Sequence, residues 1–546
     1  MHSREKTGER GVASIAGAVG NLAGKIQNRV DCFGVEAIDF VRVGEFVEPA
    51  GVKGFVSHAG RLLAPRTQRH EPLSILSSMD VTRAGAAELL RSGEFAYLRV
   101  LWCDTSNTIR FKAMHLPSLA GRIGDRDICD ALDHAVEISA ACQVLPLMRD
   151  EPVAGTGIGP THDVRLVPDW SSLTALPWTL GTSGENPEAA PRGSLQVIGN
   201  LVDGSAPWAM CPRDLLKRAI KTARNQNVEF QTGAELEFFL LKGRVPGEWE
   251  PADHAAYATT VAAERVRPVI DEISAGLWQQ GIPIHQYLSE SGPGQHEISL
   301  HHCDPLTLAD RIIAARETVR AVATAHGLTA SFAPVVFEES ASSGLHVHLS
   351  PVLDSDAGIA AAGSEYGISE TGLGIVTGLL DHLVALTALS LPTTNSRRRL
   401  RPQAWAGTFQ GWGVANKEVP VRACGFDERG LPSNIEFKAL DASANPYLAL
   451  AGICAAATDG IAGTTPVPPP LSVDPATLSA AERDELGIEE LPQTVAESVN
   501  AFEADTVLQD LFGAYADVYA AVISDQAAEM GDLTFAQERD LLLQRY

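Results

Sequence analysis

The strongest constraint on the fold is a strand-like run, Gly233 to Leu241, in which charged and apolar side chains alternate. Successive side chains of a β-strand point to opposite faces, so Glu235 and Glu237 share one face while Leu236 and Phe238 share the other. In isolation, such a strand would most simply present a solvated outer face. The strand indicates a functional site only if other segments place related chemistry beside it.

Two further runs, residues 343–350 and 434–440, alternate in the same way. The side chains that share a face are His346 with His348 in the first run, and Glu436 with Lys438 in the second. Taken alone, paired histidines on a strand are more often structural or solvated than metal ligands, and an acid beside a base fits a cross-strand ion pair. These residues suggest a site only in combination.

A turn brings two more carboxylates together. Glu290 and Glu297 flank a Pro-Gly sequence that can fold them toward a common point, although a polar hairpin loop is an equally simple explanation. The four elements together supply five carboxylates and at least one imidazole, and no thiolate. Hard oxygen ligands with a single nitrogen suit Mg²⁺ or Mn²⁺ better than zinc, and this many acids suits two ions.

Basic residues are scarce in this chain and concentrated in one region. The 43 Lys and Arg residues are outnumbered by 68 Asp and Glu, a formal net charge of −25, which argues against nucleic acid and anionic membrane as partners. A solvated face or a partner surface would account for a run of arginines, but beside a metal cluster such a run favours an anion clamp for carboxylate or phosphate. The residues concerned are Arg397, Arg398, Arg399 and Arg401, followed by Lys417 and Arg422.

Metals, arginines and the lack of an obvious nucleophilic Ser or Cys together favour phosphoryl transfer, in which positioning and charge neutralisation supply most of the catalysis. No G-x-x-x-x-G-K-[ST] sequence is present, so a nucleotide would not be bound as in P-loop enzymes. A two-metal hydrolase is the alternative that needs no nucleotide.

The chain of 546 residues is long enough for two or more domains. Residues 1–78 are rich in Gly and small residues, and we expect a loosely ordered extension there or the product of an upstream start codon. Short apolar runs separated by Gly, Pro and Ser predict a small β-rich domain over 79–208, and mixed α and β patterns predict a larger domain over 209–546. The predicted fold class is therefore α+β.

Local patterns predict several individual elements. The longest apolar tract, 374–391, contains Asp381 and His382 near its middle, so it predicts a buried helix, and no membrane span is expected. Eight scattered cysteines without a C-x-x-C pair predict reduced thiols and a cytoplasmic protein. The other expected elements are a helix at 84–90 capped by Asp80, strands at 96–102, 163–168 and 194–198, a helix after Pro212, a Pro-rich surface segment at 464–471 and helices within 493–526.

Five motifs, in this order, resemble those of the glutamine synthetase family. They lie within residues 209–462 and are G-A-E-L-E-F-F, E-S-G-P-G-Q-H-E, S-G-L-H-V-H-L-S, N-S-R-R-R-L-R-P and I-E-F-K-A-L-D-A-S-A-N-P-Y-L-A-L. The runs at 404–413 and 211–218 are most similar to the branch with fungal developmental regulators and plant nodulin-like proteins. Residues 95–208 resemble the family's small β-grasp domain, and the resemblance implies a catalytic domain with a curved antiparallel sheet flanked by helices.

The resemblance also implies a reaction and a role for each motif residue. The γ-carboxylate of glutamate takes the γ-phosphate of ATP, and ammonia or another amine then displaces the phosphate to give an amide. One Mg²⁺ or Mn²⁺ ion would be held by Glu237, Glu290 and Glu297, and a second by Glu235, His346 and Glu436. The remaining assignments are Arg399 for the substrate α-carboxylate, Arg422 for the transferred phosphate, and His348 and Ser350 for the nucleotide side.

Several positions depart from the family pattern. Where ammonia-using members have Asn-Gly for the substrate amino group, this chain has Ala341-Ser342. Lys417 and Lys438 replace two arginines of the clamp, which keeps the charge but loses the bidentate fork. Trp405 replaces the glutamate that helps guard and deprotonate ammonium, and an aromatic wall suits a larger or uncharged amine.

We therefore predict an ATP-dependent ligase that forms a γ-glutamyl amide from glutamate and ammonia or another amine. The alternative is a catalytically weak relative that works as a binding or regulatory protein. The resemblance implies a ring-based homo-oligomer of twelve subunits in which the small domain of one subunit completes the site of the next. His285 stands where the family has an acidic residue near the nucleotide, and Asp150 is the candidate for the aspartate that a neighbouring subunit supplies.

Overall fold

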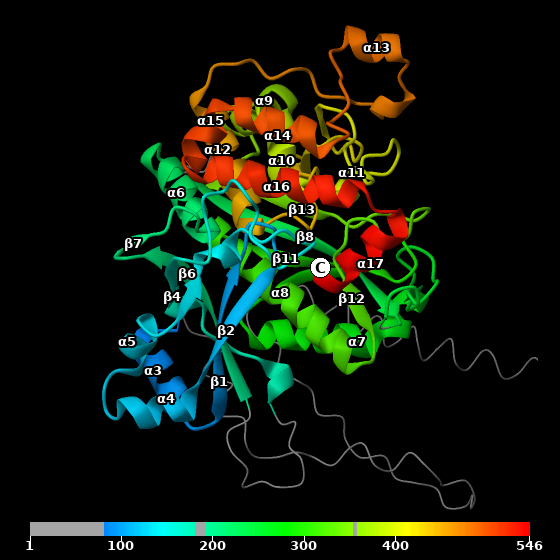
Figure 1. The fold of residues 1–546 in the computed structure, drawn as a ribbon. Helices are drawn as coiled ribbons and strands as arrows, with labels where there is room; N and C mark the ends of the chain where they lie inside the picture. Colours follow the sequence, from blue (N-terminus) through cyan, green and yellow to red (C-terminus); the bar gives the residue numbers. More distant parts are fainter. Residues whose placement is uncertain (1–80, 181–192, 244, 353–357) are drawn as a thin grey trace, which may run out of the picture. The chain divides into compact units, whose positions relative to one another are not determined.

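The computed structural model describes residues 81–180, 193–243, 245–352 and 358–546. The predictions made for residues 1–78 and for Asp80 lie outside this part of the chain. Two sheets and the helices packed against them make up the described part, which confirms the predicted α+β class (Figure 1).

The first sheet has seven strands in the order β2-β1-β6-β4-β3, with β5 and β7 also paired to β6. β1 and β6 run parallel at its centre, and its other pairs are antiparallel. The strands predicted at 96–102, 163–168 and 194–198 are confirmed as β1, β4 and β6. The bounds are β1 (Phe95–Cys103), β2 (Ile109–His115), β3 (Glu137–Ser139), β4 (Asp163–Pro168), β5 (Thr174–Ala175), β6 (Gly193–Asp203) and β7 (Ala206–Pro207).

Three helices accompany the first sheet: α3 (Arg83–Arg91), α4 (Leu116–Ile123) and α5 (Ile128–Asp133). The predicted helix at 84–90 is confirmed as α3, and the Thr82 side chain caps it by accepting a hydrogen bond from the backbone N–H of Gly85. A small apolar core that includes Leu98, Val100 and Ile128 joins these helices to the sheet. This core is separate from that of the larger sheet.

The second sheet has nine strands in the order β10-β11-β8-β13-β16-β15-β14, with β9 and β12 also paired to β8. All its pairs are antiparallel except β14 with β15 at one edge, so the predicted antiparallel sheet is confirmed with one parallel pair. The strand-like run at 233–241 is confirmed within β8. The bounds are β8 (Glu229–Lys242), β9 (Glu250–Pro251), β10 (Ile284–Ser289), β11 (Gln295–Cys303), β12 (Thr329–Ser331), β13 (Leu345–Val352), β14 (Trp412–Val414), β15 (Val421–Phe426) and β16 (Pro432–Phe437).

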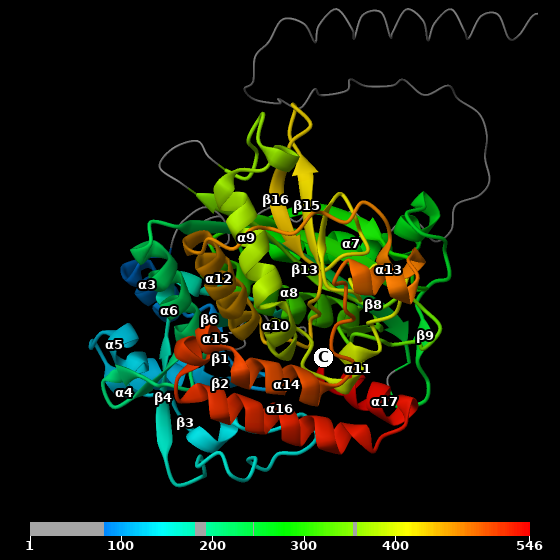
Figure 2. The same ribbon diagram turned by 90° about the horizontal axis from the view of Figure 1, so that it is seen from above.

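Helices pack against this sheet and against one another (Figure 2). The helix predicted after Pro212 and the helices predicted within 493–526 are confirmed, and the segment at 464–471 is mostly exposed, as expected. The bounds are α6 (Pro212–Asn225), α7 (Thr260–Gln279), α8 (Pro305–Ala325), α9 (Glu370–Asp381), α10 (Leu383–Ser390), α11 (Thr394–Arg397), α12 (Pro446–Ala462), α13 (Ala480–Glu485), α14 (Val495–Ala504), α15 (Thr506–Phe512), α16 (Tyr515–Gly531) and α17 (Phe535–Arg545).

The apolar tract at 374–391 forms two helices rather than one. α9 and α10 meet at His382 with a bend of 73°, and His382 Nδ1 lies 2.6 Å from Asp505 Oδ2. Both helices are largely buried, as predicted, and α9 packs against α12. Together the two pass a length and composition test for a membrane span, but no single described helix is long and apolar enough to cross a membrane.

A buried arginine forms hydrogen bonds to residues beside both sheets. Arg213, at the start of α6 and only 4% exposed, donates to both carboxylate oxygens of Asp310 on α8, at 3.0 and 2.7 Å. The same guanidinium donates to Asp169 beside the first sheet at 2.8 Å and to Asn200 on β6 at 2.8 Å. The position of the small sheet relative to the larger one therefore depends on a network of charges held away from water.

Candidate active site

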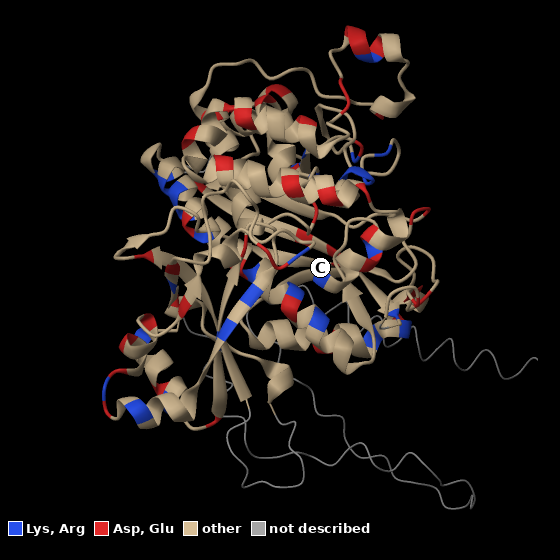
Figure 3. Ribbon diagram, in the orientation of Figure 1, with Lys and Arg blue, Asp and Glu red and all other residues tan. Residues whose placement is uncertain are grey.

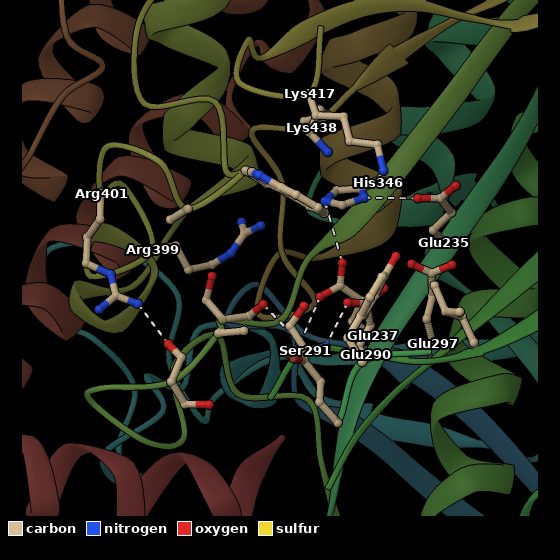
Figure 4. Close-up of a pocket in the computed structure, with 18 of the residues that line it drawn as sticks. Glu235, Glu237, Glu290, Ser291, Glu297, His346, Arg399, Arg401, Lys417 and Lys438 are labelled. Carbon is tan, nitrogen blue, oxygen red and sulfur yellow. Dashed lines mark hydrogen bonds and ion pairs between the residues drawn. The ribbon is translucent and has the colours of Figure 1, made fainter. Parts of the chain in front are cut away.

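A cavity of about 610 Å³ opens over the acidic face of the larger sheet (Figure 4). Its walls come from β8, β10, β11, β13 and β16 and from the loops around 340 and 402. Twelve of the residues that the sequence analysis selected line it: Glu235, Glu237, Glu290, Glu297, Ser342, His346, Arg399, Trp405, Lys417, Arg422, Glu436 and Lys438.

A second cavity of about 640 Å³ adjoins the first and is lined by His348 and Ser350, and also by His285, for which the resemblance implies a place near the nucleotide. Glu235, Gln286 and Arg422 line both cavities, so the two spaces meet at these side chains. The sequence analysis placed His348 and Ser350 on the nucleotide side and Arg422 at the transferred phosphate, and this arrangement is compatible with those roles.

Strand register explains why residues far apart in the sequence meet here. Glu237 on β8 lies opposite Glu297 on β11, and Glu235 on β8 lies opposite His346 on β13. On the next strand pair, Glu436 on β16 lies opposite His348 on β13. Because side chains of directly opposed residues project to the same face of an antiparallel pair, all these groups project into one region.

Three carboxylates crowd the β8–β11 side of the first cavity. Glu237 Oε2 accepts hydrogen bonds from Gln295 Nε2 and from the backbone N–H of Gly344, each at 3.0 Å. Burial, helped by the charge of Glu237, raises the pKa of Glu290 to about 7. Burial and three neighbouring carboxylates raise the pKa of Glu297 to about 9. Without a cation, these acids resist ionisation together.

Two histidines border the other side of the acidic cluster. His346 Nδ1 lies 3.1 Å from Glu235 and 3.5 Å from Glu436, and its Nε2 lies 3.7 Å from Glu237. The closest group of potential metal-ligand atoms, however, joins Glu235, His348 and Glu436, whose atoms all lie within 4.8 Å of one another. His348, selected for the nucleotide side, is therefore a second imidazole that can reach a metal at Glu235 and Glu436.

Basic neighbours stabilise the negative charges of Glu235 and Glu436. Burial opposes ionisation of Glu235, but hydrogen bonds from His346 and His348 outweigh it and lower its pKa. Glu436 is fully buried, and its pKa is lowered against the effect of burial, chiefly by the charge of Lys438. Arg422 makes a direct ion pair with the same carboxylate.

The arginine run does not form a four-residue clamp, which corrects that prediction. Arg397 donates to two backbone carbonyls, and Arg398 pairs with Glu538 of α17 at 2.8 Å; neither lines the cavity. Arg401 lines it, but donates to the carbonyls of the loop at 338–340. Arg399, 2% exposed, also lines the cavity; it donates to the backbone carbonyl of Leu440 at 3.0 Å, and the carboxylate of Asp441 lies 3.9 Å away. Basic residues also occur along β2 and α6, so they are less concentrated than the sequence suggested (Figure 3).

Trp405 and Lys417 form one wall of the cavity. Lys417 Nζ lies 4.7 Å from the centre of the Trp405 ring, within the range of a cation–π interaction. Trp405 is 48% exposed and its backbone φ of 57° lies in the left-handed region, which non-glycine residues adopt only under tertiary constraint. An aromatic face is thus presented to the opening.

Two of the lining residues that the sequence analysis did not select interact with the selected acids. Gln295 fixes Glu237 and lies inside the E-S-G-P-G-Q-H-E motif, so its position between two selected acids was a usable signal. Tyr257 is 43% exposed, and burial together with the charges of Glu290 and Glu297 raises its pKa. No sequence pattern singled out Tyr257, because it lies in an irregular segment before α7.

The known proteins that are similar to this chain belong to one family. The family model "Glutamine synthetase, catalytic domain" matches residues 209–540. A γ-glutamylpolyamine synthetase, GlnA3 of Streptomyces coelicolor, is 34% identical over 396 residues, which cover 71% of this chain and 82% of the relative. Type-1 glutamine synthetase 1 of Dictyostelium discoideum is 31% identical over 423 residues, 73% of this chain and 80% of the relative.

Solved structures agree with these sequence relatives. A structure described as a GmaS/ADP complex is 26% identical, has a TM-score of 0.70, and the match covers 84% of this chain and 99% of that one. A structure described as a novel glutamine synthase homolog is also 26% identical, with a TM-score of 0.68 over 83% of this chain and 99% of that one. The similarity to fungal and nodulin-like members stays a prediction.

Proposed function

Because the chain belongs to the glutamine synthetase family and is an ATP-dependent ligase that forms γ-glutamyl amides, we propose that its acceptor is an organic amine rather than ammonia. One observation carries this proposal: the cavity is lined by Trp405, at a position where the resemblance implies a glutamate in the members that use ammonia. The alternative of a catalytically weak binding protein is not favoured by these relatives.

The acidic cluster fits the two divalent ions that the family uses. We assign Glu237, Glu290 and Glu297 to one ion, and Glu235 and Glu436 to the other, with His346 or His348 as the nitrogen ligand. The raised pKa values of Glu290 and Glu297 support this assignment, because a bound cation would offset both the burial and the repulsion that raise them. When bound, Mg²⁺ or Mn²⁺ would neutralise the phosphates and fix the substrates.

We propose that each of the two cavities binds a different substrate. We assign ATP to the cavity that contains His348 and Ser350, with its terminal phosphate at Arg422 where the cavities meet. Glutamate would lie in the first cavity, its α-carboxylate on Arg399 and its γ-carboxylate toward Lys438. Ser342, which the resemblance places where the family binds the substrate amino group, also lines this cavity, and Lys417 would complete the charge around the transferred phosphate.

This placement gives a balanced two-step reaction. An oxygen of the γ-carboxylate attacks the terminal phosphorus, the bond to ADP breaks, and an acyl phosphate forms. The neutral amine nitrogen then attacks the acyl carbon, the carbon–oxygen bond breaks, phosphate leaves, and the nitrogen releases one proton to solvent as the amide forms. Arg422 and the two lysines offset the negative charge that develops on the phosphoryl oxygens, which is the main contribution that a protein can make to phosphoryl transfer.

The amine would enter between aromatic side chains. Trp405 and Tyr257 both line the opening, and the ring of Trp405 already holds the Lys417 ammonium. Such a surface binds the apolar body of an amine and stabilises a cationic group by cation–π contact. The γ-glutamylpolyamine synthetase among the relatives supports a di- or polyamine as the acceptor.

An amine panel tests the proposal. Purified full-length protein would be given ATP, Mg²⁺ and glutamate with ammonium, methylamine, putrescine or spermidine, and phosphate release and the amide mass would be measured. We expect a higher kcat/KM for an organic amine, and we expect Trp405→Glu to shift the preference toward ammonium by about 10-fold or more, on the scale of a single specificity contact. A wild-type preference for ammonium would overturn the proposal, and no turnover with any amine would remove the ligase assignment.

We further propose that the protein assembles into a ring-based homo-oligomer, which light scattering of the purified protein would test. We also propose that it is located in the cytoplasm. Asp150 is exposed and does not line the cavity of its own chain, which is compatible with a contribution to a neighbour. The seven cysteines in the described part of the chain are all free thiols, as expected in a reducing compartment. Mixing inactive Glu237→Ala and Asp150→Ala chains should restore activity if each site is shared between subunits.

A further inference from the structure

The turn between β1 and β2 of the small sheet is buried, although most turns lie at a protein surface. Each of its residues 104–107 is at most 3% exposed. Asn107 has a backbone φ of 63°, in the left-handed region, which asparagine tolerates better than most residues with a side chain. The turn therefore places an amide side chain in the interior of the protein.

The Asn107 amide connects two groups of the larger domain. Its Nδ2 donates to the carbonyl oxygen of Ala442 at 2.8 Å, and its Oδ1 accepts from Arg316 Nη1 at 3.0 Å. Arg316 on α8 is 1% exposed, lies over the rings of Phe332 and Tyr546, and makes no hydrogen bond through Nε or Nη2 with any described residue. The buried guanidinium therefore depends on the Asn107 oxygen for its hydrogen bond.

Residues 440–445 lie between this turn and the first cavity. On the cavity side, the carbonyl oxygen of Leu440 accepts a hydrogen bond from Arg399 Nη1 at 3.0 Å. On the other side, the Asn445 side chain donates to the carbonyl oxygen of Asp104 at 2.8 Å, beside the bond from the turn amide. The segment that fixes the Arg399 guanidinium is thus itself fixed by the small sheet.

We propose that Asn107 is a positioning residue for Arg399 and, through it, for the α-carboxylate of the substrate; the second step rests on the function proposed above. A single residue separates Ala442 from Leu440, so a displacement of the Ala442 carbonyl also displaces the carbonyl that orients the guanidinium. Recognition of a carboxylate by arginine depends on the direction of its N–H groups, and a small displacement weakens it. The turn of the small sheet would thus set the affinity for glutamate in the cavity of its own chain.

Asn107→Asp separates positioning from folding. The aspartate retains an oxygen acceptor beside Arg316 and tolerates the left-handed φ, but it replaces the Nδ2 donor by an oxygen that repels the Ala442 carbonyl. Glutamate and ATP binding to the full-length protein with Mg²⁺ would be measured by calorimetry, and melting temperatures would be recorded. We expect about 10-fold weaker glutamate binding, unchanged ATP binding and a melting temperature no lower than that of wild type, because one lost hydrogen bond is of this size.

Two further variants at the same interface complete the comparison. Asn107→Gly adopts the same φ but removes both contacts, so it should bind glutamate as weakly and also melt at a lower temperature. Asn200→Asp is the matched control, since Asn200 on β6 also accepts from a buried arginine, Arg213, at 2.8 Å, but lines neither cavity. We expect Asn200→Asp to bind glutamate like wild type.

Steady-state kinetics give a second measurement. The KM for glutamate should rise about 10-fold in Asn107→Asp with little change in kcat, since the reacting groups themselves are untouched. Glutamate binding within about two-fold of wild type in Asn107→Asp, or an equal loss of ATP binding, would overturn the proposal. If no amine supports turnover, the proposed ligase function fails while the glutamate affinities still decide the role of Asn107. A wild-type protein that binds no glutamate would overturn both.

Discussion

Removal of divalent ions should make this protein less stable as the pH rises, because buried carboxylates in the first cavity must then ionise without a cation. Burial raises the pKa of Glu290 from 4.5 to about 7 in the folded protein. For a carboxyl group whose pKa is raised on folding, the folded state holds the proton more tightly than the unfolded state. Its contribution to stability is therefore complete below pH 4.5 and is lost as the pH rises toward 7.

The size of the effect follows from the shift. At about 1.4 kcal/mol per pKa unit, the rise at Glu290 corresponds to a loss of about 3 kcal/mol between pH 4.5 and pH 7 and above. Unfolding entropy of about 2 cal/mol/K per residue gives about 1 kcal/mol/K for a body of this size, so the melting temperature should fall by about 3 °C. Glu297, whose pKa rises to about 9 through burial and its neighbouring carboxylates, extends the loss to higher pH.

The measurement compares wild type with Glu290→Gln. Chelator-treated samples of both would be melted between pH 5 and pH 9, because the neutral amide keeps the shape of the side chain but cannot ionise. The net charge of −25 lowers the stability of both proteins at high pH, and the difference between them isolates Glu290. We expect wild type to lose about 3 °C more than the variant.

Metal should act in the opposite direction. Ligands must lose their protons to bind a divalent ion, so Mn²⁺ should raise the wild-type melting temperature more at pH 8 than at pH 6. A wild-type protein that loses no more stability than Glu290→Gln, or that Mn²⁺ stabilises equally at both pH values, would refute the argument that these acids form a crowded cation site.

Three further substitutions test separate parts of the structure. Glu237→Ala should abolish phosphate release while the oligomer stays assembled, because this side chain faces the cavity; an unfolded variant would assign it a structural role. Arg213→Met should lower the free energy of unfolding by about 3 kcal/mol in a denaturant titration, since Asp310 would lose its ion pair, whereas Arg213→Lys should lose less. Gly378→Ala should cost about 1–3 kcal/mol in the same titration, because a Cβ would lie 2.0 Å from the carbonyl oxygen of Ala456; an unchanged midpoint would show that α9 and α12 can move apart.

The parts of the site that sequence could predict are those fixed by strand periodicity. Alternation alone places Glu235 with Glu237, and His346 with His348, on shared faces, and the observed register then joins them across β8 and β13. Which strands would be neighbours did not follow from periodicity, because β8, β13 and β16 are separated by about a hundred residues each. The ordered motifs of the family supplied that information.

The arginine run shows what local sequence could not supply. The four arginines within five residues have the same side chain and the same charge, yet their hydrogen-bond partners lie in distant segments. Arg398 pairs with Glu538, 140 residues away, and Arg397 is held by carbonyls that only the packing of α10 and the segment before α14 brings close. A guanidinium points toward whichever acceptors the tertiary structure leaves unpaired, so the choice of Arg399 for the cavity depends on the whole fold.

The charges lining the first cavity clarify why Trp405 matters. Five carboxylates there face five basic side chains, Arg399, Arg401, Lys417, Arg422 and Lys438, so the formal charges balance once every carboxyl group is ionised. Two divalent ions would then make the cavity positive, which suits an anionic nucleotide and glutamate but repels any protonated amine, ammonium and organic amines alike. A carboxylate at position 405 would offset part of that repulsion, and Trp405 does not. The amine must therefore gain its binding energy from contact with the aromatic surface. Ammonium is too small to make this contact, whereas an organic amine is large enough.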